Sequence, residues 1–178
     1  NYYSLFIERA HALAKPTGAI GIVCPSGIAG DKTAAPYFRS ITTTGRLLYF
    51  YDFENKKILF PDVHAMFKFC IIIVQNPDRT SVDAAELCFF IVPKNLKHIH
   101  WKIRDKKQLE WLEDDIEARK FKMSSQDFAL VNPNTGTAPI FRTPKEAEIA
   151  LRIFKEYPVL YDHQQTIGFP VKFGTMLH

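Results

Sequence analysis

Two apolar runs that flank a short connection constrain the fold of this chain most strongly. Residues 47–53 and 67–75 are rich in aromatic and β-branched side chains, which favour β-strands. The connection, residues 54–66, shows no helical periodicity, whereas a parallel pair of strands needs a crossover that is usually a helix. We therefore expect an antiparallel pair, with the loop that contains Phe60 and Pro61 at the rim of the sheet.

The start of the chain is typical of half a βαβ unit. Phe6, Ala10 and Leu13 have the i, i+4, i+7 spacing that predicts an amphipathic helix, and the apolar run 19–24 predicts a buried strand. Sheets built from such units bind ligands beyond the carboxyl ends of their strands. The loop 25–31 is therefore expected at the functional edge of the sheet.

Capping signals and periodicity predict the remaining elements. Thr143, Pro144 and Glu146 form a helix-start signature, with a capping threonine and a proline at the first helical position. The continuous apolar run 70–74 indicates a strand buried on both faces. The predicted helices cover residues 4–15, 33–43, 104–122, a short segment after 124–127, and 143–156, and the predicted strands cover 19–24, 47–53, 67–75 and 87–92.

Composition predicts a soluble protein of the cytoplasm with no membrane partner. The chain has 178 residues, of which 47% are hydrophobic, so it can bury a substantial core. No run approaches the roughly 18 apolar residues of a membrane span, and the N-terminus lacks the order of a secretory signal. Cys24, Cys70 and Cys88 lie in apolar runs and are expected to be buried, reduced thiols.

Charge leaves the type of partner open. The net charge is +4, and residues 94–122 mix cations with anions. This pattern fits either a solvated helix face or a phosphate-binding patch. His98 and His100 lack the cysteine or carboxylate partners of a zinc site, so no metal site is expected.

A series of short motifs extends in a fixed order along nearly the whole chain. They occupy residues 3–10, 15–18, 20–27, 51–55, 60–64, 67–70, 132–137, 139–142 and 158–160. In this order they resemble the adenine-N6 DNA methyltransferases of restriction–modification systems. The resemblance is to the large single-chain kind, in which methylase, target recognition and often a nuclease are fused.

The resemblance implies an α/β fold with a partial Rossmann-like methyltransferase sheet whose last strand is antiparallel, followed by an α+β junction to a target-recognition domain. Residues 1–93 would form the C-terminal half of the catalytic domain, and residues 94–178 the junction and the start of target recognition. The family's S-adenosylmethionine loop and its Asn-Pro-Pro-Tyr motif do not occur in this sequence. The chain is therefore expected to be an inactive fragment that works with the remainder of its polypeptide.

The family transfers a methyl group from S-adenosylmethionine to an adenine flipped out of double-stranded DNA. A flipped base is held by hydrogen bonds to its edge and by stacking on its faces. The position of Phe60 and Pro61 in the matched motif implies that Phe60 stacks on the base, and the alternative is a core aromatic residue. Phe6 matches a position that contacts the cofactor's adenine ring, although buried packing of its helix explains it equally well.

The resemblance also suggests where DNA phosphates bind. Lys68, Asn134, Thr135 and Arg142 are expected to contact them, because cations and short polar side chains commonly do. Solvated loop and strand-edge positions are the alternative. A second hypothesis is a non-catalytic DNA-binding or scaffolding module of a phage-defence complex, and a third is methylation of RNA or protein by a related sheet.

Overall fold

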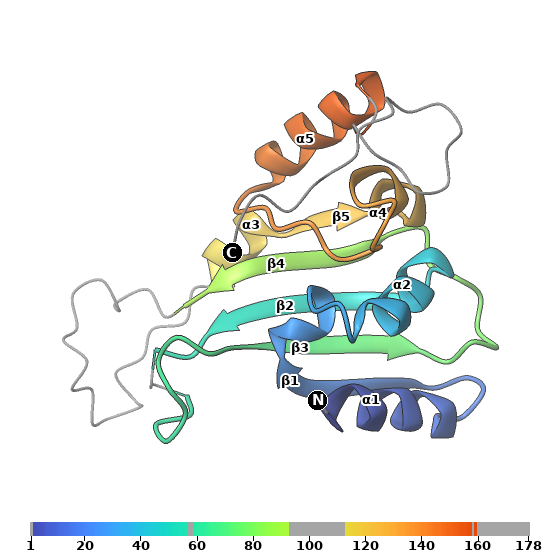
Figure 1. The fold of residues 1–178 in the computed structure, drawn as a ribbon, viewed down its shortest axis with the longest axis vertical. Coiled ribbons are helices and arrows are strands. Elements are labelled where there is room, and N and C mark those ends of the chain that lie inside the picture. Colours follow the sequence, from blue (N-terminus) through green and yellow to red (C-terminus); the bar gives the residue numbers. More distant parts are fainter. Residues whose placement is uncertain (1, 57–58, 93–112, 158, 160–178) are drawn as a thin grey trace, which may run out of the picture.

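A five-stranded mixed sheet forms the centre of the molecule, with strand order β1-β3-β2-β4-β5 (Figure 1). The structure, a computed structural model, describes residues 2–56, 59–92, 113–157 and 159. The strands are β1 (Ala19–Pro25), β2 (Leu47–Glu54), β3 (Lys68–Gln75), β4 (Ala85–Ile91) and β5 (Phe121–Met123). The helices are α1 (Tyr2–Leu13), α2 (Ala35–Thr43), α3 (Glu113–Arg119), α4 (Ser125–Val131), α5 (Pro144–Glu156) and the 3₁₀ turn η1 (Ser26–Ala29).

The expected antiparallel pair is confirmed. β3 lies between β1 and β2 and runs antiparallel to both, whereas β2 pairs in parallel with β4. In the β2–β3 register, Asp52 lies opposite Cys70 and Glu54 lies opposite Lys68. The loop that contains Phe60 therefore leaves the sheet at the edge where β1, β2 and β4 end.

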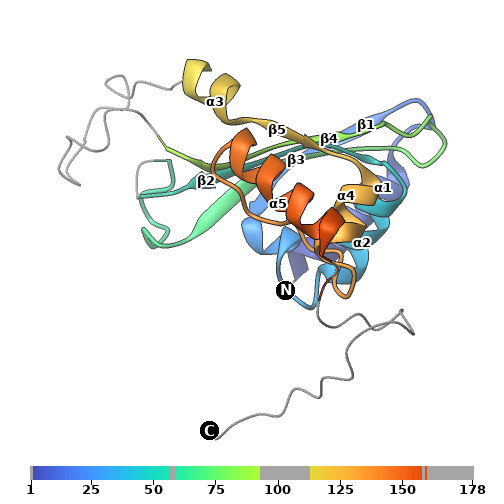
Figure 2. The same ribbon diagram turned by 90° about the horizontal axis from the view of Figure 1, so that it is seen from above.

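Helices cover one face of this sheet. α1, α2, α4 and α5 lie on the same side (Figure 2). Phe38 of α2 is fully buried there, with its ring centroid 5.9 Å from that of Phe50 in β2 and 6.3 Å from that of Phe128 in α4. Burial of one such side chain stabilises the fold by about 1.5–3 kcal/mol. This aromatic group joins the sheet to the C-terminal helices.

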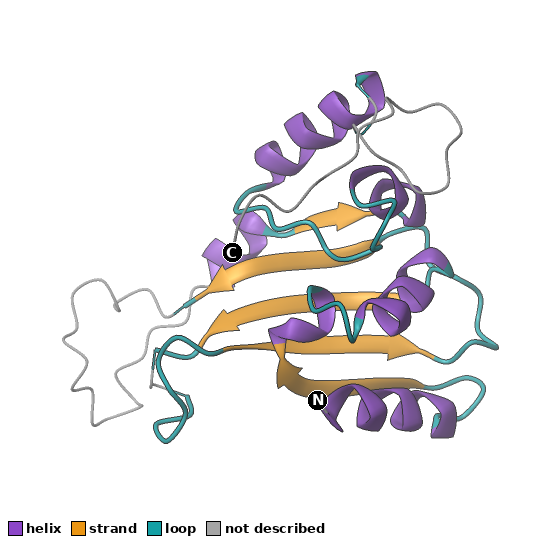
Figure 3. Cartoon of the chain, viewed as in Figure 1, coloured by secondary structure: helices purple, strands orange, loops and turns teal. Residues whose placement is uncertain are grey.

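The expected burial of the run 70–74 on both faces is met only in part. Cys70, Ile72 and Val74 point into the core and are fully buried, whereas Ile71 and Ile73 remain partly exposed. In the described ranges, the short helix α3 lies on the side of the sheet that carries Ile71 and Ile73, and it contacts β4 (Figures 2 and 3). The α/β class is therefore supported as a mixed sheet with most of its described helices on one side.

The predicted apolar face of α1 is wrong. Phe6 and Leu13 are 73% and 66% exposed, whereas Ile7 and His11 are buried against the sheet. The physical reason is a hydrogen bond: His11 Nε2 lies 2.9 Å from the carbonyl oxygen of Gln75. Because the buried residue His11 is polar, the spacing of apolar residues in α1 does not reveal which face of the helix packs on the sheet.

The helix predicted over residues 104–122 extends too far. α3 ends at Arg119, and the alternation of buried Phe121, exposed Lys122 and buried Met123 forms β5, which pairs antiparallel with β4. The two later helices are confirmed. α4 has a capping box between Ser124 and Asp127, and the Thr143 hydroxyl caps α5. β5 belongs to the main sheet, and the proposed division at residue 93 stays a prediction.

Several predictions lie outside the described residues. These are residues 104–112 of the predicted helix, most of the charged segment 94–122, and the pair His98 and His100. In the parts of the chain that the structure describes, no helix has the length and apolar character needed to cross a membrane.

Candidate nucleic-acid interface

A buried asparagine holds the loop that displays Phe60. Asn55 follows β2 directly and is 1% exposed. Its Nδ2 donates to the carbonyl oxygens of Phe60 and Val63 at 2.9 and 3.0 Å, and its Oδ1 accepts from the Phe60 backbone N–H at 2.9 Å. Because one side chain satisfies three backbone groups, the position of Phe60 is fixed by hydrogen bonds.

Phe60 forms part of an open, largely apolar cavity. Its side chain is 42% exposed, and its ring meets that of Phe69 edge-to-face at 5.0 Å. The cavity has a volume of about 240 Å³, and Lys68 is the cation on its wall. Its lining consists of Val23, Cys24, Pro25, Asn55, Phe60, Val63, Phe67, Lys68 and Phe69. Phe60 is therefore an accessible wall residue. Pro61 is exposed beside it.

The thiol of Cys24 lines this cavity, and a second thiol lies directly against it. Cys24 and Cys70 are directly opposite in the β1–β3 register, with their sulfur atoms 3.5 Å apart. The hydrogen bond with Cys70 lowers the pKa of the Cys24 thiol, whereas the same bond together with burial raises the pKa of Cys70. Cys24, Cys70 and Cys88 are all buried, as the apolar runs around them predict.

Lys68 is paired with a buried carboxylate. Asp52 on β2 is 3% exposed; its Oδ2 lies 3.4 Å from Lys68 Nζ, and its Oδ1 accepts a short hydrogen bond from the Ser26 hydroxyl. These three residues line a smaller cavity of about 80 Å³ next to the first. Asp52 thus orients the lysine and neutralises part of its charge.

The structure brings Lys68 and Arg142 together on one aromatic ring. Lys68 Nζ lies 4.0 Å and the Arg142 guanidinium carbon 4.5 Å from the ring centroid of Phe90. Phe90 has a φ of 58°, an uncommon left-handed conformation for a bulky residue. Such conformations cost of order 1–3 kcal/mol and cluster at functional sites. Two cations distant in sequence therefore share one platform at the edge where β4 ends.

The segment 132–137 is a compact loop against α2. Asn132 Nδ2 donates to the Thr137 carbonyl oxygen at 2.8 Å, and the Thr135 and Thr137 hydroxyls lie 2.9 Å apart. Between this loop and α2 lies a third cavity of about 630 Å³. Its lining consists of Gly30, Lys32, Ala35, Pro36, Arg39, Asn134, Thr135 and Thr137. Asn134 and Thr135 are thus placed beside two cations.

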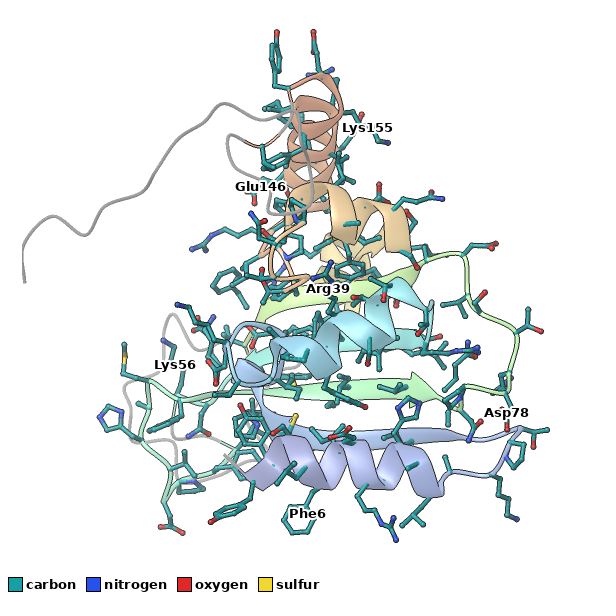
Figure 4. The ribbon with its side chains drawn as sticks, turned by 45° about the vertical axis from the view of Figure 1, so that its right-hand side comes forward. Phe6, Arg39, Lys56, Asp78, Glu146 and Lys155 are labelled. Carbon is teal, nitrogen blue, oxygen red and sulfur yellow. The ribbon has the colours of Figure 1, made fainter. Side chains whose placement is uncertain are left out.

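Phe6 lies apart from these features. It is on the outer side of α1, pointing away from the sheet (Figure 4), and it lines neither the Phe60 cavity nor the one beside Asn134. Buried packing does not explain this residue, because it is largely exposed. Among the residues that the structure describes, no group of three or more His, Cys, Asp or Glu side chains is arranged to hold a metal ion.

Several residues of the site are missing from the sequence prediction. Asn55 lies in a matched motif, and its place after a strand and before Phe60 is a signal for a loop-closing asparagine. Asp52 is a lone carboxylate among aromatic strand residues, which is a second signal. Phe90, Lys32 and Arg39 carry no comparable local signal, because their roles depend on tertiary contacts.

Comparison with known proteins supports the fold. No protein-family model and no curated protein sequence matches this chain significantly. A chain of a solved structure, described as the structural basis of complex assembly and conformational transition of the type I restriction–modification system, is similar over 86% of this chain, with a TM-score of 0.53 and 16% sequence identity. The present chain spans 36% of that chain. It shares the fold of part of a component of a restriction–modification complex.

Proposed function

We propose that this chain is part of an adenine-N6 DNA methyltransferase of a restriction–modification or phage-defence system. The observation that carries the proposal is the display of Phe60 beside an open apolar cavity, by a loop between antiparallel strands. The similarity in fold to a chain from a type I restriction–modification structure supports it. In this proposal the sheet is the later part of a Rossmann-like catalytic domain, and residues beyond it begin target recognition.

The cavity suits one face of a flipped adenine. An extruded base loses its stacking neighbours in the duplex, and an aromatic side chain replaces them. Such stacking is worth roughly 1–3 kcal/mol per base. Because Asn55 fixes the backbone of Phe60 through three hydrogen bonds, little conformational entropy is lost when the base arrives. Phe60 is then the wall, and Pro61 continues it at the rim.

The remainder of the polypeptide would supply the other components. S-adenosylmethionine provides the methyl group, and the residues that bind the target amine would come from the same remainder. Phe6 is proposed to contact the cofactor's adenine ring, since it is an exposed aromatic side chain without a packing role in α1. Lys68, Arg142, Asn134 and Thr135 are proposed to contact DNA phosphates.

Methylation kinetics test this proposal. In the natural full-length protein, Phe60→Ala should lower kcat/KM for duplex DNA by roughly tenfold or more, the equivalent of one lost stacking interaction. Phe60→Trp should retain most of the activity, because it keeps an aromatic face. Tyr157→Ala, which removes an exposed aromatic side chain after α5, is the matched control and should have no effect.

The same kinetics distinguish a methyltransferase from the alternative function, a non-catalytic DNA-binding module. The cations Lys32 and Arg39 in the cavity beside Asn134 favour DNA contact whether or not methyl transfer occurs. If the natural protein binds duplex DNA with a steep salt dependence but transfers no methyl group, the module is the correct function. Equal activity of wild type and Phe60→Ala would refute the role of Phe60.

A further inference from the structure

The third cavity points to a specific DNA contact. We infer that the cavity between α2 and the loop 132–137, here called the Arg39 pocket, binds an internal phosphodiester of the DNA strand next to the flipped base. Its walls contain Lys32, Arg39, Asn134, Thr135 and Thr137. The inference rests on the proposed function and adds two cations, Lys32 and Arg39, that the sequence motifs do not indicate.

The charges in the Arg39 pocket fit an anion. Within the described part of the chain, neither Lys32 nor Arg39 forms an ion pair with a carboxylate, in contrast to Lys68, which is paired with Asp52. No acidic residue is among the lining residues. The amide of Asn134 and the hydroxyl of Thr135 add donors of the type that commonly contact phosphate oxygens. An arginine fork also matches phosphate oxygens in a bidentate manner.

The pocket is held in a fixed shape by close packing. Gly136 has a φ of +62°, and a Cβ atom at this position would lie 2.6 Å from Arg39 Cγ. The loop backbone therefore rests directly on the aliphatic stem of Arg39. The Ala138 backbone N–H donates to the Ala29 carbonyl oxygen at 2.9 Å, which ties the loop to η1. Arg39 projects from α2 toward this loop (Figure 4).

Shared lining residues connect the Arg39 pocket with the Phe60 cavity. Lys68 lines both the Phe60 cavity and the small cavity that contains Asp52. Gly30 lines both that small cavity and the Arg39 pocket. The small cavity therefore adjoins both the Phe60 cavity and the Arg39 pocket. A DNA strand whose base stacks on Phe60 can extend past the small cavity and place its backbone in the Arg39 pocket.

Binding to chemically modified DNA tests the inference. In the natural full-length protein, Arg39→Gln keeps the stem that packs on Gly136 and removes the charge. Affinity for the target duplex should fall roughly tenfold, as for one charge-assisted hydrogen bond, and the slope of log K against log salt should fall by about one. Lys155→Gln, which removes an exposed cation at the end of α5, is the control (Figure 4).

A scan with neutral methylphosphonates locates the contact. In wild type, a methylphosphonate at one position near the target adenine should lower the affinity for the duplex. In Arg39→Gln, the same methylphosphonate should cause no further loss of affinity. Thr135→Val provides a second variant with the charge kept, and should show a smaller coupling at the same position. Thermal unfolding confirms that each variant is folded.

Two results would overturn the inference. One is that every methylphosphonate lowers duplex affinity by the same factor in wild type and in Arg39→Gln. The other is binding of inorganic phosphate or a free nucleotide that is lost in Arg39→Gln without any methylphosphonate coupling, because the ligand is then a free phosphate. Either result leaves the effect of Phe60→Ala on methylation intact. Loss of that effect, or duplex binding that ignores salt, would instead contradict the proposed function.

Discussion

The Phe60 cavity and the Arg39 pocket both adjoin the small cavity that contains Asp52, but they differ in their charged and polar residues. The first has a volume of about 240 Å³ and walls that are mostly aromatic or aliphatic, with a single cation that is already paired. The second has a volume of about 630 Å³, and two cations and three short polar side chains line it together with Gly30, Ala35 and Pro36. An apolar wall suits the flat face of a base, whereas unpaired cations suit a backbone phosphate. The proposed function therefore assigns the base and the backbone of DNA to separate elements of the chain.

Both regions nevertheless use the same structural device. In each, one asparagine at the start of a loop bonds to backbone groups later in that loop. Asn55 binds the carbonyl oxygens of Phe60 and Val63, and Asn132 binds that of Thr137. The two loops therefore differ in what they display and not in how they are closed. Variants that open one loop at a time therefore test whether the two regions bind different parts of DNA.

The largest effect is expected for Asn55→Ala. The substitution leaves the Phe60 and Val63 carbonyl oxygens and the Phe60 N–H without their partner in a site that is 1% exposed. At about 1–3 kcal/mol for a buried unsatisfied group, the free energy of unfolding should fall by about 3 kcal/mol. Chemical denaturation of the chain measures it. A loss no greater than that of an average surface substitution would show that Asn55 does not close the loop.

A smaller effect is expected for Gly136→Ala. The left-handed conformation and the clash with Arg39 together should cost about 1–2 kcal/mol of stability. Since the loop 132–137 would shift against α2, affinity for duplex DNA should fall while stacking at Phe60 is retained. Fluorescence anisotropy with a labelled duplex measures the affinity. If DNA affinity is unchanged but base stacking is lost, the assignment of the two regions is reversed.

The smallest effect on stability is expected for Phe6→Ala. The side chain is 73% exposed, so the free energy of unfolding should change by less than about 0.5 kcal/mol. Its neighbour Ile7 is 1% exposed, and Ile7→Ala should cost about 2–4 kcal/mol, which makes it a matched contrast on the same helix. In the full-length protein, Phe6→Ala should raise the KM for S-adenosylmethionine. An unchanged KM would remove Phe6 from the cofactor site.

Local patterns predicted a large part of the fold. The length of the connection 54–66 was sufficient for the antiparallel pair, and the caps at Ser124 and Thr143 placed two helices correctly. The packed face of α1 was not predictable from apolar spacing, because buried His11 is held by a hydrogen bond to another element. Likewise, β5 has only three residues and follows a charged helix directly. Its alternation of buried and exposed residues is therefore too short to be recognised in the sequence.

The candidate site was predicted less completely, for a related reason. Phe60, Asn134 and Thr135 lie in contiguous motifs and could be named from the sequence. Arg39 gains its place only through the positive φ of Gly136, which is about 100 residues away in the chain. The convergence of two cations on Phe90 also depends on tertiary structure. When the role of a residue depends on backbone that is distant in the sequence, no pattern in the neighbouring residues predicts it.

Fluorescence of 2-aminopurine reports directly on whether the target base stacks on Phe60. The analogue replaces the target adenine in a duplex bound to the natural full-length protein, where stacking on an aromatic ring quenches its emission. We expect bound 2-aminopurine to be brighter in the Phe60→Ala complex than in the wild-type complex, and emission from the Tyr157→Ala complex to equal that of wild type. Equal emission from wild type and Phe60→Ala complexes would contradict the assignment of Phe60 as a wall of the base pocket.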